Sequence, residues 1–258
     1  MCNWLKVKFL FVYYFYYIST LFQFHFKLTS KTNVLIKHIS FDLWLTLIKS
    51  HPEFKERRAK FLRKDFNPFG YSAKRIMEIV QSVDKVSDRL NEINGHKVST
   101  ECMYRKIFQK LGYSRNSFTE AEYTEIKLTV NDLFMKYQPG FLNESIRPML
   151  HTLKEEGYSL NISSNTGFIE GNVIAATLQN LNIAEYFKFC IYSDEIKASK
   201  PSTNFFDKVL VHTGLEKWEI LHIGDNYKAD YEGAIKYGFK ALHINNQQYT
   251  VDDIRRHL

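Results

Sequence analysis

Short apolar runs alternate with helical patterns along most of this chain of 258 residues. The runs that predict strands cover residues 37–42, 158–163, 187–192, 220–223 and 241–244. Patterns with apolar residues at helical spacing lie between them, at residues 144–156, 172–180, 202–211 and 229–237. Buried strands that alternate with helices of about ten residues are typical of a parallel sheet. The sequence therefore predicts an α/β fold with a doubly wound, Rossmann-like core.

A long segment without an expected strand separates the first predicted strand from the second. Residues 51–137 carry helical patterns instead, at Glu53–Lys64, Ala73–Ile93 and Thr119–Tyr137. Breaks at Asn67-Pro68, at Asn94-Gly95 and near Gly112 divide these patterns, because proline and glycine interrupt helices. We interpret residues 51–137 as an inserted α-helical cap, and residues 35–50 with 138–258 as the core.

The first 34 residues differ from the rest in composition. They hold 11 of the 40 aromatic residues, and residues 9–26 carry no formal charge between Lys8 and Lys27. Three interpretations stay open at this point. The segment is a mis-extended start, a membrane anchor of about the minimum length, or a signal sequence that lacks the usual small-residue cleavage site.

The composition of the full chain narrows the class of protein. With 45% hydrophobic and 24% charged residues, collagen-like, low-complexity and disordered classes are excluded. The net charge of +7 comes largely from residues 1–34, which supply +4. No basic stripe interleaved with aromatics stands out elsewhere, so we expect no nucleic-acid partner. A membrane partner is expected only if residues 9–26 form an anchor.

The three cysteines are Cys2, Cys102 and Cys190, which are widely spaced and form no C-x-x-C pair. A disulfide framework or a zinc ribbon is therefore not expected. This pattern favours a reducing compartment, and we expect a cytoplasmic protein.

Polar side chains follow the predicted strands where each strand ends. Asp42 ends the first strand, Ser164 and Asn165 end the second, and Lys200 follows the third. Asp225 ends the fourth strand, with Asp230 five positions later. In a parallel sheet these carboxyl ends lie at one edge, where ligands bind. A carboxylate, a hydroxyl, a cation and two further acids are therefore expected together.

This set and order resembles the four motifs of the haloacid dehalogenase-like (HAD) hydrolase superfamily, over about residues 36–245. The predicted cap lies where that family carries its type 1 helical cap. The resemblance implies that Asp42 is a nucleophile forming an aspartyl-phosphate intermediate. It also implies that Lys200 neutralises charge on the nucleophile and the transferring group. Ser164 and Asn165 would contact the substrate.

The acidic residues imply a cofactor. By the same resemblance, Asp42 and Asp225, with Asp230, would hold Mg²⁺ through oxygen ligands. Asp230 could instead be an acidic residue at the N-terminus of the following helix, where a negative charge interacts favourably with the helix dipole. Thr46 would face the same loop, or only cap the chain as it turns into the insert. The expected partner is a small phosphorylated metabolite.

The sequence departs from the phosphatase pattern at Trp44, where HAD phosphatases usually carry a second Asp that works as a general acid and base. Leu45 also replaces the Gly commonly found next. An indole N–H cannot move a proton near neutrality. Three explanations stay open: a phosphatase with good leaving groups or another proton source, a haloacid dehalogenase, or a catalytically weak protein that binds phosphorylated ligands. Trp44 is then expected at the substrate.

Two further groups of side chains could belong to the site. The cap residues Arg57, Arg58, Arg63 and Lys64 could face a substrate anion, although such a basic run is usually a solvated helix face. The residues His212, His222 and His243 are scattered, and we expect them to pack within strands and helices rather than to bind metal. The favoured interpretation is a Mg²⁺-dependent HAD-like hydrolase, a phosphatase that acts on a small phosphorylated metabolite.

Overall fold

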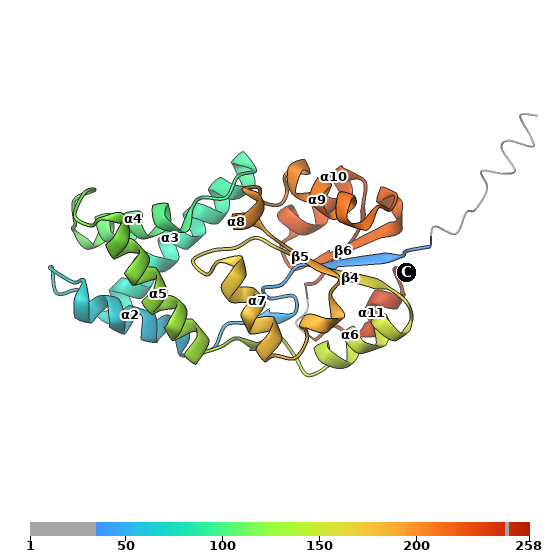
Figure 1. Cartoon of the computed structure of the whole chain (residues 1–258), viewed down its shortest axis with the longest axis horizontal. Coiled ribbons are helices and arrows are strands. Elements are labelled where there is room, and N and C mark those ends of the chain that lie inside the picture. The colour runs from blue at the N-terminus through green and yellow to red at the C-terminus, as the bar shows by residue number, and fades with distance from the viewer. Residues whose placement is uncertain (1–34, 246–247) are drawn as a thin grey trace, which may run out of the picture. The chain divides into compact units, whose positions relative to one another are not determined.

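The computed structural model describes residues 35–245 and 248–258, so the interpretations of residues 1–34 lie outside the described residues. Residues Ile36–Leu258 form one compact unit. Its centre is a sheet of five parallel strands in the order β5-β4-β1-β6-β7 (Figure 1). These strands are β1 (His38–Phe41), β4 (Ser159–Ser164), β5 (Phe189–Tyr192), β6 (Ile220–Gly224) and β7 (Lys240–His243). The predicted parallel α/β fold is confirmed.

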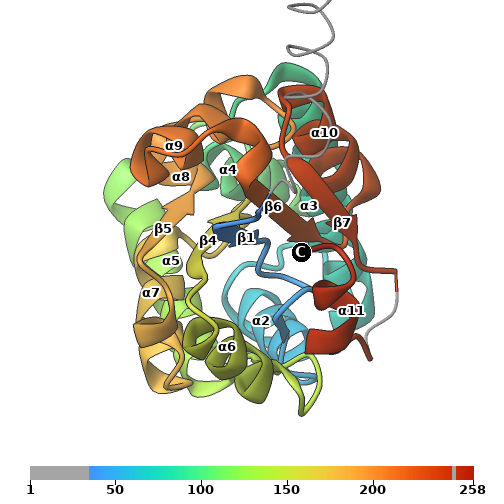
Figure 2. The same ribbon diagram turned by 90° about the vertical axis from the view of Figure 1, so that its right-hand side faces the viewer.

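Helices cover both faces of this sheet (Figure 2). On one face α9 (Thr203–Thr213) and α10 (Gly233–Tyr237) pack a cluster that includes Phe205, Phe206 and Ile220. On the other face lie α6 (Ile146–Glu155) and α7 (Gly171–Asn180), with α11 (Val251–Arg255) near α6. The short helix α8 (Ser193–Ile196) follows β5. Neither α8 nor α11 is part of the sequence prediction, because five or fewer residues give no clear helical period.

The predicted helix at residues 229–237 has two parts. A π-helix, η3 (Tyr227–Glu232), precedes the α-helix α10. The Asn226 side chain caps its start by accepting hydrogen bonds from the backbone N–H groups of Lys228 and Ala229. Asp230 then turns its carboxylate back to the backbone N–H of Asn226, at 3.0 Å. The wide turn therefore places the Asp230 side chain beside the end of β6.

The segment predicted as a cap is helical. It holds α2 (Phe54–Asp65), α3 (Ala73–Asn94), α4 (Thr100–Leu111) and α5 (Glu120–Lys136). Side chains of Ser72, Ser99 and Thr119 cap the starts of the last three helices, which is a common role for such residues. The sequence analysis did not name α4, although Ser99 and Gly112 bound it. The extent of a separate cap domain stays a prediction.

A pair of two-residue strands connects this segment to the sheet. Strand β2 (Ile48–Lys49) pairs antiparallel with β3 (Gly140–Phe141), so the chain leaves and returns at one place. The sequence analysis missed the pair, because two residues carry no measurable alternation.

Across residues 35–245 and 248–258, no helix combines the length and apolarity needed to cross a bilayer. Cys102 and Cys190 are free thiols, and Cys2 lies outside the described residues.

Candidate active site

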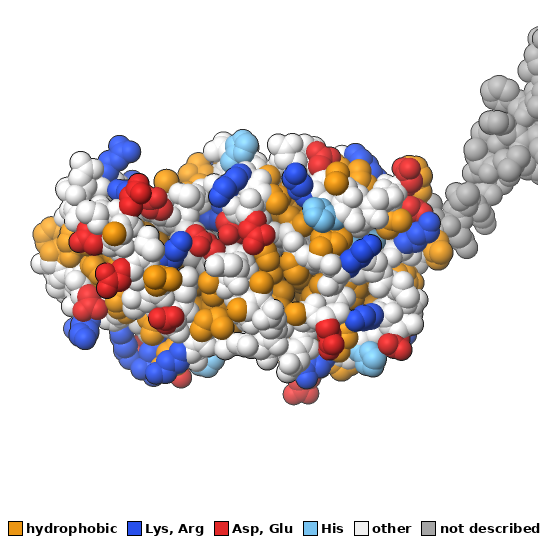
Figure 3. All heavy atoms as spheres, viewed as in Figure 1, with side chains coloured by type: hydrophobic (Ala, Val, Ile, Leu, Met, Phe, Trp, Pro, Cys, Tyr) orange, Lys and Arg blue, Asp and Glu red, His pale blue; other side chains and the backbone are white. Residues whose placement is uncertain are grey.

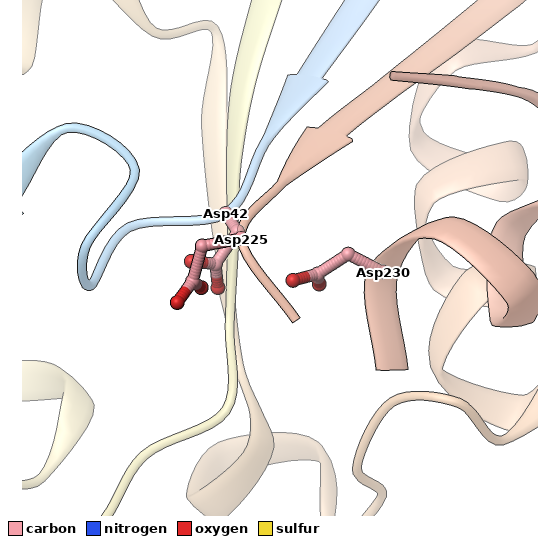
Figure 4. A group of neighbouring side chains, drawn as sticks. All are labelled: Asp42, Asp225 and Asp230. Atoms are coloured by element: carbon pink, nitrogen blue, oxygen red, sulfur yellow. The ribbon is translucent and has the colours of Figure 1, made fainter. Parts of the chain in front are cut away.

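Three carboxylates meet at the carboxyl edge of the sheet. Asp42 follows β1, Asp225 follows β6, and Asp230 comes from η3, and their side chains converge in Figure 4. One oxygen of each lies within 4.8 Å of one oxygen of the other two. The sequence predicts these residues at one edge, and the fold brings them together there. An all-oxygen set of this size suits a hard divalent cation such as Mg²⁺.

Lys200 joins two of these carboxylates. Its Nζ donates to Asp42 Oδ1 at 2.8 Å and lies 2.7 Å from Asp230 Oδ1, and it also donates to the Ser163 carbonyl oxygen at 2.5 Å. The side chain is only 1% exposed, so all three ammonium donors are used inside the protein. The Asn165 side chain holds the Lys200 backbone, since its Oδ1 accepts from Lys200 N and its Nδ2 donates to Lys200 O.

The other predicted site residues lie around Asp42. The Thr46 hydroxyl donates to Asp42 Oδ2 at 3.0 Å, so Thr46 is more than a cap on the chain. Tyr249 fixes this loop by donating from its hydroxyl to the Thr46 carbonyl oxygen. Ser164 is fully buried, and its hydroxyl lies 3.4 Å from the carbonyl oxygen of Asn165.

The site carries more negative than positive charge. Burial raises the pKa of Asp42 to about 7, against the lowering effect of Lys200, and the other two carboxylates raise it further. Burial and the neighbouring Asp230 raise the pKa of Asp225 to about 6. Burial opposes ionisation of Asp230 as well, but Lys200 and the His222 hydrogen bond together hold its pKa below the usual range. One lysine thus faces three carboxylates, which leaves an excess that a divalent cation would neutralise.

A buried hydrogen-bond chain holds Asp230 from within the sheet. Strand register sets Ser40 of β1 level with Asn161 of β4 and His222 of β6. His222 Nε2 lies 3.2 Å from Asp230 Oδ1, so this nitrogen donates, and its Nδ1 accepts from the Ser40 hydroxyl at 3.0 Å. Ser40 in turn accepts from Ser163 Oγ at 2.8 Å, and Ser163 accepts from Asn161 Nδ2 at 3.0 Å.

The sequence analysis treated His222 as packing and did not single out Ser40, Asn161 or Ser163. His222 is fully buried, and burial lowers its pKa, which favours the neutral ring. It therefore works as a donor to a site carboxylate as well as packing against Phe206. The available signal was polar residues at alternate positions of buried strands, as in HISF and SLNISS, which turn to one face of the sheet.

Comparison with known proteins places this arrangement in a family. The model of haloacid dehalogenase-like hydrolases matches residues 39–244. The chain belongs to this family. It is 29% identical to the Rhythmically expressed gene 2 protein of Drosophila melanogaster over 110 residues, which are 42% of this chain and 41% of the fly protein. It is 34% identical to a phospholysine phosphohistidine inorganic pyrophosphate phosphatase of Bos taurus over 76 residues, 28% of each chain.

These matched stretches span less than half the length of either curated relative. Among solved structures, the HAD-hydrolase YfnB from Bacillus subtilis, described as bound to magnesium, has a TM-score of 0.66 to this chain. It is 15% identical and covers 87% of this chain and 99% of its own. At that identity the likeness shows the fold alone.

This haloacid dehalogenase-like hydrolase has a cavity of about 380 Å³ above the three carboxylates, the size of a small-molecule site. Asp42, Asn165, Lys200, Asp225 and Asp230 line it on the core side. Thr46 and Ser164 are not among the described residues that line it. The predicted site residues therefore divide into a cavity surface and a buried support.

Trp44 also lines the cavity. Its half-buried indole packs edge-on against Phe134 of α5, with ring centroids 6.2 Å apart. Leu45, the next residue, adopts a left-handed backbone with φ of 58°, a conformation that favours glycine. An aromatic contact between core and α5 stands where the usual proton-transferring carboxylate would be.

The structure separates the basic residues of the cap segment. Arg57 is partly exposed and forms an ion pair with Glu53, and Arg63 and Lys64 are exposed at the end of α2. Arg58 is different, since it lines the cavity and is only 8% exposed. The sequence carried a signal for this: Phe54, Arg58 and Leu62 are four residues apart and share the buried stripe of α2.

Proposed function

We propose that this protein is a Mg²⁺-dependent phosphatase that hydrolyses a small phosphorylated metabolite through an aspartyl-phosphate on Asp42. The observation that carries the proposal is the set of three converging carboxylates with one buried lysine. Such a set binds a divalent cation and presents an oxygen nucleophile to a bound phosphoryl group. The membership of the HAD-like hydrolases and the phosphatase name of the bovine relative support it.

The buried contacts explain how Asp42 would be aimed. Lys200 and Thr46 each hold one of its oxygens, which fixes the rotamer of the carboxylate. Asp42 attacks phosphorus, the bond to the leaving oxygen breaks, and water later cleaves the acyl phosphate to release inorganic phosphate. Lys200 offsets the negative charge on the nucleophile and the transferring group. We assign Ser164 and Asn165 to the phosphoryl side, with Ser164 reaching it after a rotamer change.

The cation would lie among Asp42, Asp225 and Asp230. When bound, Mg²⁺ would screen the phosphoryl charge and orient its oxygens. The two pKa values raised by burial and mutual repulsion, at Asp42 and Asp225, fit a site that is incomplete without a cation. Asp230 differs, since Lys200, His222 and a backbone N–H already use its oxygens. We therefore assign the direct contacts to Asp42 and Asp225, and a positioning role to Asp230.

Trp44 restricts the chemistry of the leaving group. Because an indole cannot protonate a departing oxygen, we propose that esters with acidic leaving groups, such as aryl and acyl phosphates, are preferred. Trp44 then forms part of the apolar wall against which the leaving group lies.

The charge balance of the remaining chain and its thiols fit a cytoplasmic enzyme without a nucleic-acid partner, and we propose that location. Figure 3 shows acidic and basic side chains interspersed on one face.

The test is a panel of aryl, acyl and alkyl phosphates, assayed with Mg²⁺ and with a chelator. We expect hydrolysis of the aryl and acyl esters that chelator abolishes. A 2-haloacid belongs in the same panel, because halide leaves without a proton and that reaction needs no metal. Release of halide in chelator, with no phosphate release in Mg²⁺, would replace the phosphatase proposal by a dehalogenase. Binding of phosphate esters without turnover would indicate a ligand-binding protein.

A further inference from the structure

Arg58 is a buried cation that has no anionic partner within the part of the chain that the structure describes. It is 8% exposed, yet none of the described residues accepts a hydrogen bond from its guanidinium or forms an ion pair with it. The neighbouring Arg57, by contrast, forms both a hydrogen bond and an ion pair with Glu53. No Arg58 nitrogen is among the fully buried polar atoms that lack a partner, so its N–H groups reach the cavity. Holding a guanidinium at such low exposure without a protein acceptor is costly, so a structural role alone does not account for this arginine.

Two aromatic rings contact the guanidinium group of Arg58 and leave its N–H groups free to bind a ligand. Its guanidinium carbon lies 4.9 Å from the ring centre of Phe168 and 5.2 Å from that of Phe54. Contacts with ring faces orient a guanidinium without using its N–H groups, which lie in its plane. Burial lowers the pKa of Arg58, with Tyr104 and Asp84 acting in the opposite direction. The side chain thus resembles a prepared receptor for a planar anion.

Arg58 lines the same cavity as Asp42 and Lys200. From this placement we infer that Arg58 binds a carboxylate on the leaving-group side of the substrate, so that the enzyme prefers phosphorylated carboxylic acids. The inference rests on the proposed phosphatase function. A guanidinium fork matches a carboxylate with two parallel hydrogen bonds. Lys55, three residues earlier on α2, lines the cavity too and adds a second positive charge nearby.

The opposite charges on α3 favour a carboxylate over a second phosphate. Asp84, Asp88 and Glu92 are four residues apart on α3 and all line the cavity. Asp84 reaches the core side, with Oδ1 3.2 Å from the position that a Cβ on Gly167 would take. Burial raises the pKa of Asp84, and burial with the neighbouring Asp84 raises that of Asp88 to about 6. A dianion would be repelled by this wall more strongly than a monoanion.

The test uses two ligands that cannot be hydrolysed and differ by one carboxylate. Phosphonoacetate and methylphosphonate are titrated into the full chain with Mg²⁺ by isothermal calorimetry. We expect phosphonoacetate to bind about 10- to 100-fold more tightly, the range of a charge-assisted hydrogen-bonded pair. Arg58→Met should bring this ratio close to one, and Arg58→Lys should keep part of it. Arg57→Met, on the same helix, should keep all of it.

The unfolding temperature of Arg58→Met shows whether Arg58 binds a ligand or supports the fold. Without ligand, Arg58→Met should unfold at the same temperature as the wild type or higher, because it removes a buried charge without a partner. A lower unfolding temperature, with the preference for phosphonoacetate kept, would overturn the inference. So would a wild-type ratio near one.

Failure of the phosphatase proposal gives a different result. If no phosphate ester is hydrolysed and neither phosphonate binds, malonate is titrated in their place. Weaker malonate binding by Arg58→Met would then support the carboxylate site by itself. Unchanged malonate binding by this variant, or none by the wild type, would overturn it.

Discussion

The cavity is lined by the ends of the strands (the core side) and by helices α2 and α3 (the cap side). The charged side chains of the two sides differ in how they are paired. On the core side Lys200 uses all three of its donors, and Asp42 and Asp230 each have partners for both oxygens. On the cap side Arg58 has no ion pair or hydrogen bond with any described residue, and the same holds for the Asp84 carboxylate. The core side is therefore organised before a ligand arrives. The cap side keeps charged groups available for the ligand.

This difference follows from the elements that supply each side. Parallel strands fix the ends of β1, β4 and β6 in register, so residues far apart in sequence meet with little freedom. Helices α2 and α3 instead present side chains at four-residue spacing across the cavity. Strand ends suit chemistry that demands fixed geometry, whereas helix faces suit selection among ligands. The following predictions test this division.

Replacing the nucleophile should have the largest effect. Asp42→Asn should lower turnover by at least about 10⁴-fold, because loss of a nucleophile removes the covalent route. Asn is nearly isosteric and can still accept from Lys200, so far-UV circular dichroism and the unfolding temperature should stay close to the wild type. The measurement is steady-state hydrolysis of an aryl phosphate. Wild-type turnover by this variant would exclude the aspartyl-phosphate.

Removing the buried lysine should have the next largest effect, on stability. Lys200→Met leaves Asp42 and Asp230 buried without their cation, which should lower the free energy of unfolding by about 3–5 kcal/mol. Urea unfolding in chelator measures it. The control is Lys236→Met, since Lys236 is exposed and its ion pair is with Glu232 at the surface. No measurable change is expected there, and equal losses in both variants would contradict the core-side network.

Magnesium should stabilise the protein by an amount that grows with pH. In the ion-free protein the pKa values of Asp42 and Asp225 are about 7 and about 6, above the ordinary 3.8. Both carboxyls therefore keep protons at pH 5, which a cation must displace, and have lost most of them at pH 8. At a Mg²⁺ concentration 100 times the dissociation constant at pH 8, the stabilisation should be about 2.7 kcal/mol at pH 8 and smaller at pH 5. The rise in unfolding temperature on adding Mg²⁺ measures it.

The controls for that shift come from the two sides of the cavity. Asp225→Asn should remove both the shift and its pH dependence. Asp88→Asn should leave both unchanged, although the pKa of Asp88 is also about 6, because Asp88 lies on α3 rather than at the strand ends. A shift that is independent of pH, or one that Asp88→Asn abolishes, would place the cation elsewhere.

Sequence reasoning worked best where the sheet decides the geometry. A carboxylate at the end of an apolar run is visible as a pattern, so Asp42, Asp225, Lys200 and Asp230 could be placed at one edge. The alternation of strands and helices likewise predicted the five-stranded core. The same reasoning missed the Ser40–His222 chain, since polar residues inside buried strands gain meaning only from the register between strands.

The cap side was less predictable for a physical reason. A basic run on a helix is usually solvated, and only the rotation of α2 against the core decides which side chain turns inward. That rotation buries Arg58 and leaves Arg57 partly exposed, paired with Glu53. The helix α4 and the β2–β3 pair also went unnamed, because their formation depends on packing and on chain direction more than on local pattern.

The smallest expected effect is at Trp44, which stands between the two sides. Its indole packs on Phe134 and moves no proton, so Trp44→Phe should cost less than about 1.5 kcal/mol of stability, the range of one aromatic pair. It should also leave unchanged the steep fall in rate from aryl to alkyl phosphates. That fall is expected because an alkoxide needs a proton in the transition state and a phenoxide does not.

Trp44→Asp should flatten this dependence of rate on the leaving group if the carboxylate reaches the leaving oxygen. A flat dependence already in the wild type would mean that another group donates the proton, and Asp84 and Asp88 on the cap side would be the first to replace.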